Sequence, residues 1–458
     1  MSRRRVVLAT FPAQGHINPA LQFAKRLLKA GTDVTFFTSV YAWRRMAKTT
    51  SSPPGLHFVA FSDGYDDGLK PGGDGGRYMS EMKARGREAL RALLLSTDAA
   101  FLVYSHLFAW AAEVARDAHV PSALLWVEPA TVLCIYHFYF NGHAAAIDAG
   151  SDEIQLPGLP PLEQRDLPTF LLPETPERFK SMMREKLETL DGEEGKAKVL
   201  VNTFDALEPD ALAAIDRYEL IGIGPLIPSA YLGGGDPSDK SYGGDLFKKS
   251  DDEGCAAWLD AQPPSSVVYV SFGSVLKLPK AQMEEIAKAL LASARPFLWV
   301  IRQQQHNEED EAEEELSSIT ELRKLGKMVS WCSQLEILGH ASVGCFVTHC
   351  GWNSAVESLG LGVPVVAVPQ WFDQATNAKL MEDVWGSGVR VRVNEGGGVD
   401  GCELQRCIEM VIDGGEKSRA VRENASKWKA LAREAMAENG SSIKNLDTFL
   451  QQVIGNLV

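Results

Sequence analysis

The chain has 458 residues, and one compact core rarely grows that large, so two domains are expected. Hydrophobic residues make up 45% of the chain and charged residues 23%, which is ordinary for a globular protein in water. The formal net charge is −14, with 46 Lys and Arg against 60 Asp and Glu. This balance argues against binding to the phosphate backbone of nucleic acid.

The start of the chain resembles a secretion signal only at first sight. Its apolar run covers just Val6–Phe11, and Pro12, Gln14 and His16 follow, so the run is too short and too polar for a signal peptide. No uninterrupted apolar run has the length needed to span a membrane. The seven cysteines include no Cys-x-x-Cys pair, which favours reduced thiols. We therefore expect a cytoplasmic protein with no stable membrane insertion.

The first half of the chain alternates apolar strands with amphipathic helices. The pattern predicts strands over 5–11, 33–39, 99–105 and 122–127, a glycine-containing turn over 12–20, and helices over 21–31 and 110–120. Continuously apolar strands between helices are typical of a parallel sheet that is covered on both faces. The first half therefore predicts an α/β domain.

A polar stretch rich in Gly, Pro and Ser interrupts this alternation and reads as a linker, after which the pattern restarts. Further strands are predicted over 266–274, 296–301, 344–349 and 363–369, with a helix over 280–293. We expect an N-terminal domain over 1–235, a linker over 236–253, a C-terminal domain over 254–440 and a last amphipathic helix over 441–458. Ligands of such sheets bind beyond the carboxyl ends of the strands.

The stretch "THCGWNSAVES" (Thr348–Ser358) holds an unusual number of polar side chains between two apolar runs. It reads as the end of a strand, a tight turn, and the start of a helix that Asn353 or Ser354 would cap. The first turn of a helix presents unpaired N–H groups and a partial positive charge, and His349 adds a donor, so a diphosphate is the natural occupant. Glu357 lies about one turn further on and suits the hydroxyls of a ribose. The alternative is an ordinary capped helix beside a histidine that is satisfied by its neighbours.

The flanks of this stretch decide between the two interpretations. From Trp331 through Gln374 the sequence resembles, without a gap, the signature box of plant UDP-sugar-dependent glycosyltransferases. The stretches "FPAQGHINPALQFAKRL" and "WLDAQPPSSVVYVSFGS" are also similar to that family. The resemblance implies the GT-B fold, in which two Rossmann-like parallel-sheet domains face a cleft and the last helix crosses back to the N-terminal domain.

The resemblance implies a role for each residue of the box. Trp331 would stack on uracil and Cys332 would offer backbone groups to its edge, while Gln334 and Glu357 would contact the ribose. The diphosphate would be held by His349, Asn353, Ser354 and Ser274. The sugar hydroxyls would be held by Trp352, Asp373 and Gln374, and Gln at this last position resembles enzymes that prefer UDP-glucose. No Asp-x-Asp tripeptide occurs in the chain, so we expect no metal and no cofactor besides the donor UDP-glucose.

His16 matches the catalytic base of that family, although a histidine that caps the following helix is the plain alternative. An Asp usually orients this base, but the matching position here is Ser105, with His106 beside it. Moving a proton from a phenol to an ordinary His is uphill by about 3.5 pKa units, roughly 5 kcal/mol. A carboxylic acid is already ionised at neutral pH, so the missing Asp favours glucose-ester formation or an acidic phenol. Glu128, after another strand, is a possible substitute for the Asp.

We therefore expect an inverting, metal-independent glucosyltransferase that is monomeric and acts on a small aromatic or carboxylic acceptor. The acceptor would be a lipophilic plant metabolite, either a phenol such as a flavonoid or a carboxylic acid. Candidate residues for its pocket are the aromatic residues Phe108, Trp110, Tyr136, Phe138 and Phe140, although core packing explains each of them as well. The alternative is a UDP-sugar-binding protein with little turnover, acting as a sensor or a partner subunit. A Rossmann oxidoreductase lacks its glycine fingerprint here.

Overall fold

The structure is a computed structural model, and it describes residues 4–46, 53–70, 72–149, 153–234, 236–243, 254–274, 278–301, 316–394 and 396–455. The chain forms two compact units. Unit 1 contains Met1–Gln164, Phe170–Phe247 and Glu434–Val458, and unit 2 contains Arg165–Thr169 and Lys248–Arg433. Residues 244–253 of the expected linker lie outside the described residues.

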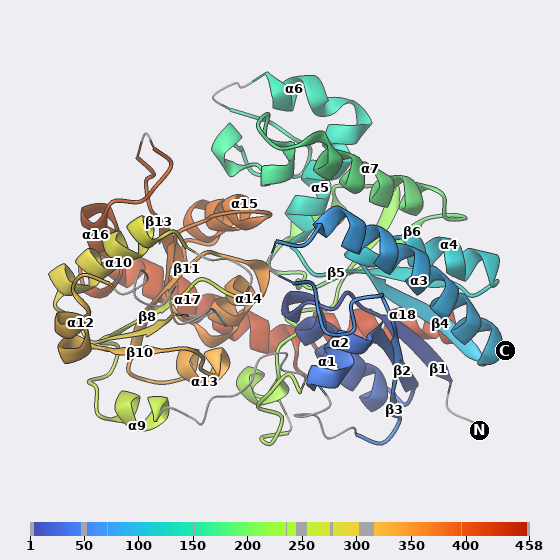
Figure 1. Cartoon of the computed structure of the whole chain (residues 1–458), viewed down its shortest axis with the longest axis horizontal. Coiled ribbons are helices and arrows are strands. Elements are labelled where there is room, and N and C mark those ends of the chain that lie inside the picture. Colours follow the sequence, from blue (N-terminus) through green and yellow to red (C-terminus); the bar gives the residue numbers. More distant parts are fainter. Residues whose placement is uncertain are drawn as a thin grey trace. The chain divides into compact units, whose positions relative to one another are not determined.

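The described part of unit 1 contains a seven-stranded parallel sheet in the order β3-β2-β1-β4-β5-β6-β7 (Figure 1). Its strands are β1 (Arg5–Ala9), β2 (Asp33–Ser39), β3 (Leu56–Phe61), β4 (Ala99–Ser105), β5 (Ser122–Trp126), β6 (Ala197–Val201) and β7 (Tyr218–Gly222). The apolar runs expected at β1, β2, β4 and β5 are confirmed as strands, and their side chains are almost all buried.

Helices connect these strands. They are α1 (Gln14–Lys29), α2 (Val40–Met46), α3 (Gly75–Ser96), α4 (Trp110–Asp117), α5 (Ala130–Phe138), α6 (Ala144–Asp148), α7 (Glu177–Asp191), α8 (Pro209–Ala213) and α18 (Ser441–Gly455). Short 3-10 or π turns lie at η1 (His106–Phe108), η2 (Tyr139–His143), η3 (Gln164–Asp166), η4 (Thr169–Leu171) and η5 (Ser229–Leu232).

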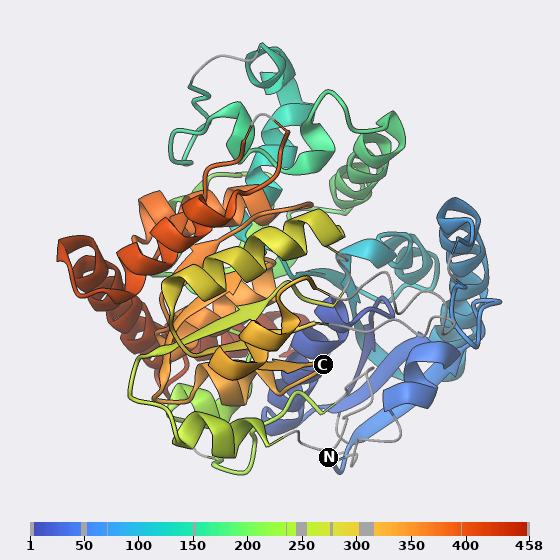
Figure 2. The ribbon, with the colours of Figure 1, turned by 60° about the vertical axis from the view of Figure 1, so that its left-hand side comes forward.

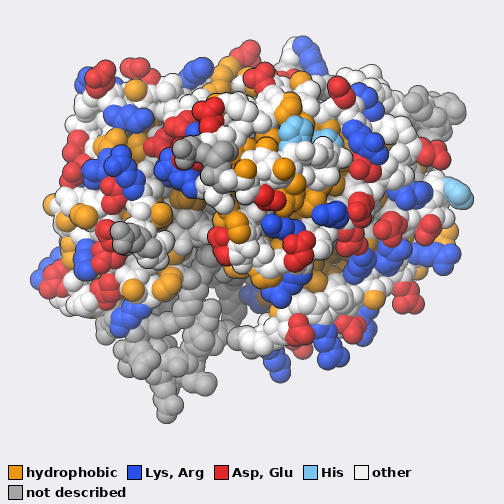
Figure 3. All heavy atoms as spheres, turned by 90° about the horizontal axis from the view of Figure 1, so that it is seen from above, with side chains coloured by type: hydrophobic (Ala, Val, Ile, Leu, Met, Phe, Trp, Pro, Cys, Tyr) orange, Lys and Arg blue, Asp and Glu red, His pale blue; other side chains and the backbone are white. Residues whose placement is uncertain are grey.

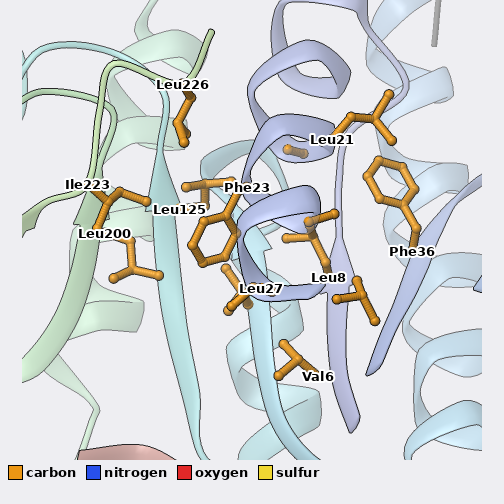
Figure 4. Packing of buried hydrophobic residues seen from close by; sticks show 14 of the residues in the cluster. Val6, Leu8, Leu21, Phe23, Leu27, Phe36, Leu125, Leu200, Ile223 and Leu226 are labelled. Carbon is orange, nitrogen blue, oxygen red and sulfur yellow. The ribbon is translucent and has the colours of Figure 1, made fainter. Parts of the chain in front are cut away.

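Helix α1 begins earlier than the sequence indicates. A turn was expected over 12–20, because Gly15 and Pro19 are typical helix breakers, but the helix starts at Gln14 and contains Pro19. The side chains of Phe23 and Leu27 point from α1 to the sheet and pack with Leu8 and Leu125 (Figure 4). Burial of this apolar face outweighs the loss of one helix hydrogen bond at Pro19. His16 therefore lies in the first turn of a helix rather than in a loop.

The last helix belongs to unit 1, as the GT-B fold requires. Leu446 and Phe449 of α18 are buried in the same core cluster as α1. The Phe449 ring meets the Phe101 ring of β4 edge to face at 5.4 Å. The side chain of Ser442 donates a hydrogen bond to the carbonyl of Gly224. Segments from the two ends of the chain thus share one core.

The described part of unit 2 contains a six-stranded parallel sheet in the order β10-β9-β8-β11-β12-β13. The yellow and orange part of the ribbon in Figure 2 belongs to this unit. Its strands are β8 (Val267–Ser271), β9 (Phe297–Val300), β10 (Lys327–Val329), β11 (Val343–Thr348), β12 (Val365–Ala367) and β13 (Gly388–Arg390). Its helices are α9 (Cys255–Asp260), α10 (Lys280–Ser293), α12 (Ile319–Leu325), α13 (Gln334–Leu338), α14 (Trp352–Leu361), α15 (Gln374–Lys379), α16 (Gly401–Ile412) and α17 (Glu416–Ala435), with the π turn η6 (Leu380–Val384).

In both sheets, the order in which strands are added reverses at one pair of neighbouring strands. In unit 1 the order runs outward from β1 to β3 on one side and from β4 to β7 on the other. In unit 2 the same change occurs between β8 and β11. Ligands of open parallel sheets bind beyond the carboxyl ends of the strands at such a point. The residues that follow β1, β4, β8 and β11 are therefore the first place to look for chemistry.

The described helices and the face drawn in Figure 3 show how the molecule meets its surroundings. Within the described ranges, no helix is long and apolar enough to cross a bilayer. On the face drawn in Figure 3, the side chains of Lys and Arg are intermingled with those of Asp and Glu. This mixture does not resemble the continuous basic stripe that binding to a phosphate backbone favours.

Candidate active site

In unit 2, His349 follows β11 and its ring lies between two glycines. A Cβ on Gly273 would lie 2.7 Å from Nε2 of the His349 ring, and a Cβ on Gly351 would lie 2.6 Å from the same atom. Gly273 also has a φ of +78°, which a residue with a side chain rarely adopts. Both glycines are therefore needed for His349 to sit between the turn after β8 and the start of α14. Ser274 follows Gly273 directly and is partly exposed.

The cap of helix α14 lies two or three residues earlier than the expected cap at Asn353 or Ser354. Its N-cap is Gly351, so Asn353 and Ser354 lie within the first turn and do not cap it. The preceding residue, Cys350, has a φ of +60°, and its N–H is bonded to the hydroxyl of Thr348 at 3.3 Å. A glycine cap has no side chain that could compete for the N–H groups of the first turn. Such an uncapped start of a ten-residue helix suits an anion.

Side chains from β8, α13 and α14 form a polar cluster beside this helix start. The amide of Gln334 donates hydrogen bonds to the hydroxyl of Ser354 at 3.0 Å and to the carboxylate of Glu357 at 2.6 Å. The Tyr269 hydroxyl of β8 donates to the Gln334 side-chain oxygen at 3.4 Å. Ser354 and Glu357 are almost fully buried. Sequence analysis assigned Gln334 and Glu357 to the same ligand, and the structure brings them into contact.

Two residues of the expected uracil site lie next to this cluster. Trp331 and Cys332 follow β10 and are both partly exposed. The Cys332 sulfur lies 3.5 Å from the hydroxyl of Tyr269. Tyr269 was absent from the sequence-based set, because a tyrosine inside an apolar strand looks like an ordinary core residue.

Asp373 and Gln374 are held by local hydrogen bonds. Gln374 accepts hydrogen bonds from the N–H groups of Gln370 and Trp371, both at 2.9 Å. Asn377 donates to the Asp373 carboxylate at 2.7 Å and to the Cys350 carbonyl at 2.8 Å. Burial raises the pKa of Asp373 to about 6, although the bond from Asn377 opposes the shift. Asn377 thus ties Asp373 to the turn before α14, and sequence analysis missed it.

Trp352, a residue expected to contact the sugar, lies at the start of α14 and is buried. Its side chain is 3% exposed and packs against Trp385, with ring centroids 5.9 Å apart. A ligand could therefore meet Trp352 only through its backbone.

The loop before α15 is fixed by a segment from earlier in the chain. Phe372 and Thr169 exchange two hydrogen bonds of 2.9 Å, and Thr376 donates to the carbonyl of Asp166 at 2.6 Å. The Asp166 carboxylate is 1% exposed and pairs with Arg390 at 2.6 Å and with Lys379 at 3.7 Å. The local pattern around residue 166 gives no sign of these contacts, which span about two hundred residues.

In unit 1, His16 lies in the first turn of α1, just beyond the carboxyl end of β1. Its side chain is partly exposed, but its Nδ1 atom is buried and has no hydrogen-bond partner among the described residues. Burial and the nearby Lys186 lower the pKa of His16 to about 3, so the imidazole is neutral at physiological pH. A neutral imidazole can accept a proton.

Ser105 ends β4, the neighbour of β1, and is fully buried. Its hydroxyl accepts a hydrogen bond from the N–H of Phe11 at 3.1 Å. The residue that contacts the ring of His16 is the next one, His106, with ring centroids 4.7 Å apart. Nε2 of His106 lies 3.4 Å from Oε1 of Glu128, which follows β5. Ser105 thus joins β4 to the end of β1, while His106 and Glu128 lie beside the expected base.

The five aromatic candidates for the acceptor pocket differ in exposure. Phe108, Trp110, Tyr136 and Phe138 are buried, as core residues would be, and Phe140 is partly exposed. The Phe11 ring meets the rings of His16 and Phe108 edge to face, at 5.5 and 6.0 Å. The Phe11 ring therefore links the His16 ring to the buried Phe108. No group of three or more His, Cys, Asp or Glu side chains is placed to hold a metal ion within the described ranges.

These two sites, each at the switch point of a parallel sheet, define a nucleotide-sugar-dependent transferase. Residues 238–429 match the family model "UDP-glucoronosyl and UDP-glucosyl transferase". The chain is 79% identical over 458 residues to anthocyanidin 3-O-glucoside 5-O-glucosyltransferase 1 of Perilla frutescens, covering 99% of both chains. It is 55% identical to crocetin glucosyltransferase of Gardenia jasminoides, covering 98% of both chains.

The fold agrees with these matches. The crystal structure of Os79 from O. sativa in complex with UDP superimposes with a TM-score of 0.86 at 36% identity, covering 98% of this chain and 100% of that chain. The chain therefore belongs to the plant UDP-glycosyltransferase family and has the GT-B fold. It is an enzyme that transfers glycosyl groups to small plant metabolites, which sets aside the alternative of a sensor without turnover.

Proposed function

We propose that this enzyme transfers glucose from UDP-glucose to a phenolic hydroxyl of an anthocyanidin 3-O-glucoside, with inversion at the anomeric carbon. The single observation that carries the proposal is the 79% identity to the Perilla enzyme along the whole chain. The cluster around His349 and α14 supports a nucleotide sugar as the donor. Gln374 at the end of the box supports glucose as the sugar.

His16 would act as the general base. It takes the proton of the acceptor hydroxyl at Nε2 while the acceptor oxygen forms a bond to the anomeric carbon of the sugar. The bond from that carbon to the UDP oxygen breaks, and UDP leaves with the electron pair from the opposite face. A single displacement converts the α-linked donor into a β-linked product. The site residues Ser274, Trp331, Cys332, Gln334, His349, Asn353, Ser354, Glu357, Asp373 and Gln374 would bind the donor, and Trp352 would contribute its backbone.

The weak basicity of His16 favours an acceptor that ionises readily. A base with a pKa of about 3 is poorly matched to an ordinary phenol, whose pKa is about 10. A hydroxyl conjugated to the cationic ring of an anthocyanidin loses its proton more readily than that of a simple phenol. The absence of an Asp at position 105 is therefore compatible with this acceptor class.

A carboxylic acid is the second candidate acceptor. It is favoured by the same weak base and by the 55% identity to the crocetin enzyme. Its product would be a glucose ester, which mild base cleaves, whereas a phenolic glucoside survives.

The test is UDP release from UDP-glucose with a panel of anthocyanidin 3-O-glucosides, simple phenols and carboxylic acids, followed by treatment of each product with mild base. The proposal predicts UDP release that depends on the acceptor, turnover fastest with anthocyanidin glucosides, base-stable products and full activity in the presence of a chelator. Fastest turnover with acids and base-labile products would support the ester instead. Loss of activity in chelator that Mg²⁺ restores would contradict the metal-free donor site.

A further inference from the structure

The carboxyl ends of three adjacent strands place a chain of polar side chains at the switch point of the unit 1 sheet. His16 follows β1, His106 follows β4, and Glu128 follows β5. The His16 and His106 rings are in contact, and the Glu128 carboxylate lies 3.4 Å from Nε2 of His106. His106 also contacts the ring of Trp126, with centroids 4.9 Å apart, which fixes its plane.

Two ring nitrogens in this series of polar side chains have no hydrogen-bond partner among the described residues. Nδ1 of His16 and Nδ1 of His106 are both buried, and neither has a hydrogen-bond partner among the described residues. A buried polar atom without a partner costs free energy, so such atoms in a folded protein need an explanation. A histidine base also needs a partner on its second nitrogen, which fixes its tautomer and stabilises its protonated form. The two observations concern the same atom of His16.

We propose that His106 and Glu128 together position and charge-stabilise His16 as the base of the transfer reaction, so that a His–His–Glu chain replaces a direct carboxylate partner. The inference rests on the proposed role of His16. The Nε2–H group of His106 donates a hydrogen bond to the Glu128 carboxylate, which leaves Nδ1 of His106 as an acceptor. That atom then accepts a hydrogen bond from Nδ1–H of His16.

The proton balance is simple. The acceptor hydroxyl gives its proton to Nε2 of His16 as its oxygen bonds to the anomeric carbon and UDP departs with the electron pair. His16 is then an imidazolium whose Nδ1–H donates a hydrogen bond to Nδ1 of His106. No proton moves from His16 to His106 or from His106 to Glu128. Glu128 contributes a negative charge that partly balances the new positive charge. The hydrogen bonds of a base are often long in the absence of substrate and shorten in the reacting complex.

Lys186 of α7 is the charged group that opposes this arrangement. Its side chain is 8% exposed, and Nζ contacts the sulfur of Met183 at 3.2 Å. Burial lowers the pKa of Lys186 to about 8, against the influence of Glu128, so it is largely protonated at neutral pH. Its charge lowers the basicity of both histidines. Glu128 therefore faces one cation in the resting enzyme and would face a second when His16 takes a proton.

The test compares Glu128→Gln and His106→Phe with the control Glu113→Gln, whose carboxylate pairs with Arg87 away from His16. Gln keeps the size of Glu without its charge, and Phe keeps the ring that packs on Trp126 without its nitrogens. We expect kcat to fall about 10- to 100-fold in both test variants and not in the control. The acidic limb of the pH profile of kcat/KM should move to lower pH in Glu128→Gln, because the charge that stabilises protonated His16 is gone. Glu128→Asp should restore part of the activity.

Further results separate the possibilities. The melting temperature should stay close to that of the wild type, which excludes a collapsed unit 1, and UDP binding should persist, which shows that the donor residues of unit 2 are intact. His106→Gln is the substitute variant if Glu128→Gln or His106→Phe unfolds, because Gln preserves a hydrogen-bonding side chain. In His106→Gln, the ¹⁵N resonances of His16 should still show a titration that differs from that of the wild type. Wild-type kcat and an unmoved acidic limb in both Glu128→Gln and His106→Phe would overturn the inference. Full activity of His16→Ala would instead overturn the role of His16 itself.

Discussion

Among single residues, Asn377 opposes the effect of burial on the charge state of Asp373. The carboxylate of Asp373 is 7% exposed, and burial raises its pKa to about 6. The hydrogen bond from Asn377 favours the ionised form, which is the form that accepts hydrogen bonds from sugar hydroxyls. Donor binding should therefore weaken as the pH falls through the pKa of Asp373. We therefore expect Asn377, which was outside the predicted set, to influence donor binding through Asp373.

Replacing Asn377 with Ala tests this dependence. Without the hydrogen bond, the pKa of Asp373 rises further, so more of the carboxyl group is protonated at pH 7. We expect KM for UDP-glucose at pH 7 to rise about tenfold, equivalent to about 1.4 kcal/mol, and its increase on acidification to begin at a higher pH. Asn424→Ala, which removes a bond to the carbonyl of Gly386, is the matched control. A KM–pH curve identical to that of the wild type would show that Asn377 does not act on Asp373.

Among the elements, the predictable ones are those whose signals are local. The apolar runs of β1, β4, β8 and β11 define the strands, and the stretch around Thr348–Ser358 contains the turn and the helix start. The predicted start of α1 was wrong because tertiary burial outweighs the helix-breaking residues Gly15 and Pro19. The predicted start of α14 was wrong because a glycine replaces the expected polar cap. Long-range contacts, such as those of Asp166, left no local pattern.

The segment around Asp166 offers a test at this scale. Asp166→Asn removes the only charge that the described structure pairs with Arg390, and it weakens the hold on the loop before α15. Breaking a buried ion pair from one side should lower the free energy of unfolding of unit 2 by about 3 kcal/mol. KM for UDP-glucose should also rise, because the loop carries Asp373. Urea unfolding measures the first effect, with Asp413→Asn at the exposed pair with Arg295 as control. Equal stability of both variants would contradict this role.

For the whole molecule, the sequence was sufficient for the class and insufficient for the acceptor. The box from Trp331 to Gln374 is contiguous, so its resemblance to the family could be recognised directly, and the fold and family are confirmed. The base site is assembled from the ends of three strands that are distant in the sequence, and its composition depends on which strands are neighbours. The His106–Glu128 contact therefore became visible only in three dimensions, although His106 had been noted beside Ser105 and Glu128 as a possible substitute for the Asp.

The central claim is that the enzyme transfers glucose with inversion to a phenolic oxygen through His16. It is tested most directly by NMR analysis of the product formed from UDP-glucose and an anthocyanidin 3-O-glucoside, with His16→Ala in parallel. The account predicts a second glucose attached in the β configuration through a base-stable bond, with turnover lowered about 10²- to 10⁴-fold in His16→Ala while UDP binding persists. An α-linked product, or equal turnover in His16→Ala, would contradict it.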